Sequence, residues 1–170
     1  VTQRRRPLFS DSQNRRWLGA SFRKARRALP FDIDAIVLLP DHLHIVMRPL
    51  DGVDYSKLWR KIKSIFTVYV LHGRDSNAKM VHQDARYRFG HGRRKGEADV
   101  WQRRFYEHTI RDEYDWGRHV DYIHWNPVKH GLVRRPQEWK WSSIHRYIAK
   151  GLLVPDWPCG KDLDLPQVQE

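Results

Sequence analysis

The sequence has little of three things that point to particular classes of protein: cysteine, long apolar runs and acidic residues. Cys159 is the only cysteine, so the chain forms neither an internal disulfide nor a cysteine-based metal site. No run of 18 apolar residues is present, which argues against a membrane-spanning helix. No signal peptide is recognisable. These features predict a cytoplasmic protein with no membrane partner.

The shortage of acidic residues leaves a large positive charge. The chain holds 32 Lys and Arg against 20 Asp and Glu, a formal net charge of +12. Basic side chains gain affinity for polyanions by releasing counterions. Because they lie in several segments and are mixed with aromatics, nucleic acid is favoured over a membrane surface or a merely soluble basic surface. The candidate DNA contacts are Arg4, Arg5, Arg6, Arg15, Arg16, Arg23, Lys24, Arg26, Arg27, Arg60, Lys61, Lys63, Arg103, Arg104 and Lys129.

Hydrophobic spacing predicts a mixture of helices and strands in one domain with appendages. A catalytic domain is expected over 1–133, with a polar, basic and flexible insertion at 73–98. Residues 134–170 are expected to form a C-terminal tail that packs on or near this domain. The predicted elements are a helix from Ser10-Asp11-Ser12 to Pro30, strands 31–39 and 42–48, a helix after Asp54, a β-like stretch 99–110, a helix 111–133 and a short helix 143–150.

Two histidines follow the turn between the two strands. Side chains alternate faces along a strand, so His42 and His44 are expected to point the same way. Two neutral imidazoles on one face could hold a metal ion. The same spacing is more often a polar pair on a half-exposed strand. Taken alone, the pair therefore leaves both interpretations open.

The predicted helix 111–133 carries a tyrosine that could act as a nucleophile. Tyr122 and Asn126 are four residues apart, so they share a helix face. Next to a metal ion, a phenol is a credible nucleophile for phosphate, and the Asn126 oxygen could be a third ligand. His119 and His108 are candidates for a general base or an orienting group. The alternative is that Tyr122 is an amphipathic helix residue with a buried ring.

Together, these motifs resemble a known family of enzymes. The HLH motif follows an apolar strand and Pro-Asp, and YIHWNPVKHGLV begins at Tyr122. WQRRFYEHTIR precedes the tyrosine and WKWSS follows it. The combination resembles the HUH-class Y1 single-strand DNA transposases, in particular the branch of REP-associated tyrosine transposases, where REP denotes repetitive extragenic palindrome. The resemblance covers most of the chain.

The resemblance implies a ferredoxin-like α+β fold with an antiparallel sheet and helices packed on it. It also implies that His42, His44 and Asn126 bind Mg²⁺ or Mn²⁺, and that Tyr122 attacks single-stranded DNA beside a hairpin. The product would be a 5′-phosphotyrosine intermediate and a released 3′-OH, which a second strand can rejoin. The enzyme would act as a monomer or a homodimer.

Two other functions remain open on the sequence. One is a hairpin DNA-binding protein derived from such an enzyme that no longer cuts. The other is an RNA-binding protein that uses the same basic and aromatic surface. Formation of a covalent protein–DNA adduct separates the enzyme from both.

Overall fold

The computed structural model describes residues 1–72, 99–102, 106–158 and 163–167. The chain divides into two compact units. We call Val1–Phe31, Pro40–His42 and Pro49–Arg104 the N-terminal unit, and Asp32–Leu39, Leu43–Arg48 and Phe105–Glu170 the C-terminal unit. The predicted insertion 73–98 lies outside the described residues. The prediction of a domain boundary at residue 133 stays a prediction.

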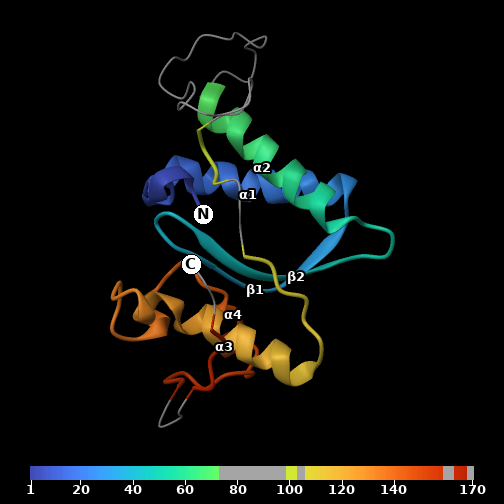
Figure 1. The fold of residues 1–170 in the computed structure, drawn as a ribbon. Helices are drawn as coiled ribbons and strands as arrows, with labels where there is room; N and C mark the ends of the chain where they lie inside the picture. The colour runs from blue at the N-terminus through green and yellow to red at the C-terminus, as the bar shows by residue number, and fades with distance from the viewer. Residues whose placement is uncertain (73–98, 103–105, 159–162, 168–170) are drawn as a thin grey trace. The chain divides into compact units, whose positions relative to one another are not determined.

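Two helices dominate the N-terminal unit. The 3-10 turns η1 (Gln3–Arg5) and η2 (Leu8–Ser10) lead into α1 (Ser12–Ala28), which packs beside α2 (Tyr55–His72) (Figure 1). Helix α1 begins where predicted, because the Asp11 carboxylate accepts hydrogen bonds from the backbone N–H groups of residues 13 and 14. Among the described helices, none is long and apolar enough to cross a membrane.

An aromatic cluster joins the ends of the N-terminal unit. The ring of Phe9 lies 5.6 Å from that of Phe66, and Phe66 lies 5.1 Å from Trp101, measured between centroids. Thr2 pairs with Trp101 in an isolated antiparallel bridge. The prediction of a β-like stretch over 99–110 is wrong for its described part, since residues 106–110 form no strand. Trp101 packs as a core aromatic, which explains why the composition resembled that of a strand.

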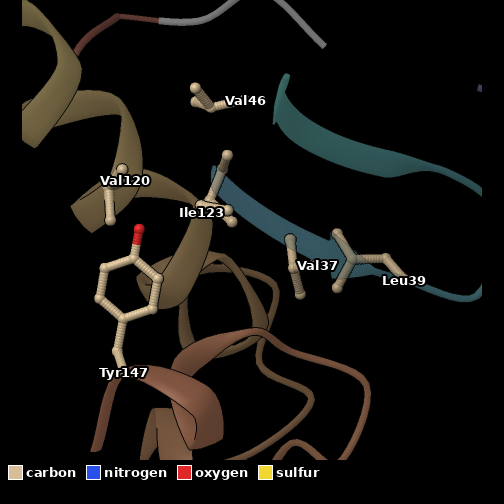
Figure 2. Close-up of a cluster of buried hydrophobic side chains, with 7 residues drawn as sticks. Val37, Leu39, Val46, Val120, Ile123 and Tyr147 are labelled. Atoms are coloured by element: carbon tan, nitrogen blue, oxygen red, sulfur yellow. The ribbon is translucent and has the colours of Figure 1, made fainter. Parts of the chain in front are cut away.

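The C-terminal unit is built on a hairpin and one long helix. Strands β1 (Phe31–Leu38) and β2 (Leu43–Pro49) pair antiparallel, and α3 (Glu113–Lys129), η4 (Pro136–Glu138) and α4 (Ile144–Ala149) follow. Side chains from the hairpin and α3 form one apolar cluster, which Figure 2 shows. Its buried members are Ala35, Val37, Leu39, Val46, Val120, Ile123 and Tyr147. The mixed α+β class is thereby confirmed.

Proline does not interrupt helix α3. Pro127 lies inside the helix, which continues to Lys129 as a single element. The sequence suggested either a kink or a new helix at this residue. Gly131 follows the helix with a φ of 66°, a left-handed conformation that glycine adopts without strain. Tyr122 and Asn126 therefore lie on one uninterrupted helix.

Ser143 connects β1 to α3. Its Oγ accepts a hydrogen bond from the Ile36 backbone N–H at 2.9 Å and is hydrogen-bonded to His124 Nε2 at 2.9 Å. Its own N–H donates to the Ile36 carbonyl at 2.8 Å. Burial lowers the pKa of His124 to about 4, and the charges of Arg146 and His145 act in the same direction. His124 is thus a neutral structural residue.

We expect Ser143→Ala to lower the free energy of unfolding by about 2 kcal/mol, because it leaves buried hydrogen-bonding groups on β1 and α3 without their partner. Urea unfolding monitored by circular dichroism measures this loss. The matched control is Ser142→Ala, whose Oγ accepts one local hydrogen bond from Ile144 N–H at 3.2 Å. Equal losses in the two variants would contradict the role given to Ser143.

Candidate functional site

Tyr122 and His44 lie against each other in the C-terminal unit. Their ring centroids are 5.3 Å apart at an interplanar angle of 89°, an edge-to-face contact. Strand alternation places His44 on the same face of β2 as Val46, which packs in the cluster with Val120 and Ile123 of α3. The hairpin and α3 thus bring together two predicted site residues that are far apart in sequence.

A lysine contacts the phenol of Tyr122. Lys129 Nζ donates a hydrogen bond to Tyr122 Oη at 3.1 Å and lies 4.9 Å from the centre of its ring. The tyrosine is only 3 % exposed, whereas Lys129 is exposed. The hydroxyl therefore lies just beneath a positively charged side chain at the surface. An ammonium group in this position stabilises negative charge on the phenol oxygen.

Asn126 is fully buried on α3, one turn beyond Tyr122. Neither its Oδ1 nor its Nδ2 has a hydrogen-bond partner among the described residues. A buried amide in this state is costly, by about 1–3 kcal/mol for each unsatisfied group. Such a group needs an explanation, and an unmodelled ion is one of the usual ones.

His42 belongs to the N-terminal unit and is also buried. Its Nδ1–H donates to Asp41 Oδ1 at 2.6 Å, and the other carboxylate oxygen of Asp41 accepts from Arg5 at 3.0 Å. Burial raises the pKa of Asp41, but the hydrogen bond from His42 and the charges of His42 and Arg5 lower it further, and the net pKa lies below the usual value. A carboxylate on one imidazole nitrogen is the arrangement that orients metal-binding histidines.

Comparison with known proteins follows from this geometry. No protein-family model matches the chain. The REP-associated tyrosine transposase of Escherichia coli is 38% identical over 135 residues, which cover 79% of this chain and 67% of that protein. The chain belongs to the family of REP-associated tyrosine transposases.

Two further comparisons agree with membership in this family. A candidate REP-associated tyrosine transposase of Haemophilus influenzae is 34% identical over 86% of this chain and 77% of its own length. A solved structure of a REP-associated tyrosine transposase bound to a REP hairpin has a TM-score of 0.72 and 32% identity. That match covers all of this chain and 89% of the other. The transposase fold is therefore shared along the chain.

In this transposase, the two histidines predicted as a general base contact Asp115 of α3. His108 Nε2 lies 2.7 Å from Asp115 Oδ2, and His119 Nδ1 lies 2.8 Å from the Asp115 carbonyl oxygen and 3.2 Å from Oδ1. The imidazoles of His108 and His119 stack at 4.5 Å. Their role toward Tyr122 stays a prediction. Asp115 was missed, although its spacing of four residues from His119 on a helix was a usable signal.

Most of the predicted DNA contacts are exposed. Four of them make local interactions: Arg5 with Asp41, Arg15 with the carbonyls of residues 9 and 10, Lys63 near the Trp101 ring, and Lys129 with Tyr122. Burial lowers the pKa of Lys63. Arg103 and Arg104 lie outside the described residues. The exposed set is Arg4, Arg5, Arg16, Arg23, Lys24, Arg26, Arg27, Arg60, Lys61 and Lys129.

Proposed function

We propose that this transposase cuts and rejoins single-stranded DNA at hairpins, with Tyr122 as the nucleophile. The contact of Tyr122 with His44 and Lys129 carries the proposal. A nucleophile, a possible metal ligand and a cation converge there on one hydroxyl. The solved relative bound to a REP hairpin supports hairpin DNA as the substrate class.

The residues present fit a divalent cation. We propose that His42, His44 and Asn126 hold Mg²⁺ or Mn²⁺, since imidazole and amide oxygen donors suit Mn²⁺ and Asn126 has a buried amide without a partner among the described residues. His42 and His44 are separated by one residue, so the chain keeps their Cα atoms within about 7 Å. Asp41 orients the His42 imidazole through Nδ1. The bound cation would supply Lewis-acid polarisation of the scissile phosphate.

The chain's own residues account for the other requirements of the reaction. Tyr122 Oη forms the new bond to phosphorus as the bond from phosphorus to the 3′ oxygen breaks. The phenol loses its proton and the departing 3′ oxygen gains one. The Lys129 ammonium stabilises the charge that develops on Oη. Attack by a second 3′-OH reverses the step, so the phosphodiester energy is kept and no nucleotide cofactor is needed.

Lys129→Met should slow formation of the covalent adduct by about a hundredfold at saturating DNA, because a preorganised donor to the reacting oxygen is lost. Lys129→Arg keeps the charge and is the matched control, expected to retain most of the rate. Single-turnover kinetics with labelled DNA measure the effect. A change in DNA affinity alone, with the rate at saturation unaffected, would assign Lys129 to phosphate binding instead.

The proposed function is tested with hairpin DNA that carries a single-stranded flank and is labelled at one end or the other. With Mn²⁺ present, the 3′-labelled strand should become attached to the protein on a denaturing gel. The 5′-labelled strand should give a shorter fragment that a polymerase can extend. This pair of results identifies a 5′-phosphotyrosine and a released 3′-OH, whereas water-mediated hydrolysis gives no adduct.

The same experiment addresses the alternatives. Tight binding of several hairpins without any adduct would overturn the enzyme and favour a protein that only binds hairpin DNA. Tighter binding of matched RNA hairpins, again without an adduct, would favour an RNA-binding protein. The oligomeric state enters through mixing: a cleavage-dead chain combined with a second inactive variant restores activity only if protomers share sites.

A further inference from the structure

Three side chains with metal-ligand chemistry meet in the C-terminal unit, apart from the residues assigned to cleavage. Asp115 and His119 are four residues apart on α3, so they lie on the same face of the helix. His108 comes from the segment before the helix. The donor atoms of these three residues all lie within 4.8 Å of one another. We call His108, Asp115 and His119 the HDH cluster.

The local backbone explains why the three residues meet. Asp112 caps α3 by accepting a hydrogen bond from the Asp115 N–H at 2.8 Å, which sets the start of the helix. The Arg111 N–H donates to Asp115 Oδ2 at 3.1 Å, so the chain turns tightly just before this cap. The turn brings His108 back over the first turns of α3, where its ring stacks on that of His119.

The geometry is close to that of a metal site. His108 Nε2 lies 2.7 Å from Asp115 Oδ2, and His119 Nδ1 lies 3.2 Å from Asp115 Oδ1. Ligand atoms around a tetrahedral zinc ion, with bonds of about 2.0–2.2 Å, are about 3.4 Å apart. Small side-chain movements would therefore suffice to admit the ion. Two imidazoles and one carboxylate, with a position left for water, form a common zinc ligand set.

Burial and charge also favour a cation. The side chains of His108, Asp115 and His119 are 25 %, 6 % and 12 % exposed, so the carboxylate is shielded and the His108 side leaves access. The hydrogen bond from His108 outweighs burial and lowers the pKa of Asp115 to about 2, which keeps it ionised. His119 Nε2 is shielded from solvent and has no hydrogen-bond partner in the described part of the chain.

We propose that the HDH cluster binds a divalent transition-metal ion of the zinc type. The ion would replace the hydrogen bonds among the three side chains and tie the segment around His108 to the first half of α3, the helix that carries Tyr122. One neighbouring charge opposes it: Arg111 Nε lies 3.4 Å from Asp115 Oδ2. The Arg111 side chain is 74 % exposed and can turn toward solvent.

The test uses the full chain with His42→Ala and His44→Ala, which removes the ligands proposed for the cleavage site. Zinc binding is followed by calorimetry and by metal content after gel filtration, and cobalt by its visible absorption. We expect one zinc per chain, with a rise in melting temperature. Adding Asp115→Asn or His119→Gln should weaken binding by about a hundredfold or more, since even partners of ligands contribute about 10–100-fold.

Matched variants keep the result interpretable. Glu113→Gln removes an exposed acidic residue from the same helix turn and should leave zinc binding unchanged. His108→Gln keeps a hydrogen-bond donor for Asp115 but removes the imidazole, so it should fold normally and lose zinc. Arg111→Gln removes the opposing charge and should tighten binding by about threefold to tenfold.

Zinc binding that is the same in Asp115→Asn, His119→Gln and His108→Gln as in the parent would overturn the proposal, as would no zinc bound by the folded parent. A cobalt spectrum without the absorption of nitrogen-coordinated ion would do the same. Because the parent already lacks His42 and His44, these outcomes are independent of DNA cleavage. Failure of cleavage in the wild-type chain leaves the zinc result standing, and the reverse also holds.

Discussion

Tyr122→Phe is expected to abolish the covalent adduct, with a loss of at least about a thousandfold in the rate of strand cleavage. Removal of a nucleophile leaves only the residual rate enhancement of the surrounding site. The variant keeps the aromatic ring, so the edge-to-face contact with His44 at 5.3 Å should persist. Only the hydroxyl that accepts from Lys129 is lost. The measurement is the protein-linked band on a denaturing gel with 3′-labelled hairpin DNA.

Binding and cleavage must be separated in this experiment. Affinity for DNA comes mainly from contacts with phosphates, so Tyr122→Phe should bind the hairpin within about twofold of the wild type. Tyr114→Phe is the matched control, because Tyr114 lies on the same helix, is 67 % exposed and hydrogen-bonds Asp164 through its hydroxyl. It should form the adduct at the normal rate. An adduct that survives in Tyr122→Phe would mean that another residue attacks.

The parts of the site that could be predicted depend on short-range periodicity. Alternation along β2 placed His44 and Val46 on one face, and the structure has that face against α3. The four-residue spacing placed Tyr122 and Asn126 on one side of a helix. The cap at Asp11 and the hairpin after residue 30 have local chemical causes too. In each case neighbouring residues alone determine the feature.

What could not be predicted depends on contacts between segments. Lys129 was assigned to DNA on its charge, yet it lies seven residues beyond Tyr122 and donates to its hydroxyl. The stacking of His108 on His119 requires the turn before α3 to fold back. The aromatic stretch around Trp101 resembled a strand because core aromatics and strand aromatics are alike in composition. Only packing against Phe66 distinguishes them.

His44→Ala should lower the rate of cleavage by at least about a thousandfold while hairpin affinity stays within about twofold. The reason is that the imidazole serves the reaction at Tyr122, whereas affinity rests on phosphate contacts. Cleavage of labelled hairpin DNA and fluorescence anisotropy give the two quantities. His145→Ala is the matched control, since His145 is exposed and lies on α4, and it should change neither. Equal losses of binding and cleavage in His44→Ala would point to a structural role.

A titration with Mn²⁺ distinguishes a metal ligand from a residue that only packs against Tyr122. Asp41→Asn weakens the partner that orients His42, so it should shift the Mn²⁺ concentration for half-maximal cleavage upward by about 10–100-fold and recover at saturation. His44→Ala loses a proposed ligand and should recover only in part. If neither variant shifts the Mn²⁺ dependence, the histidine pair does not bind the metal. The edge-to-face contact of His44 with Tyr122 would then serve only to position the phenol.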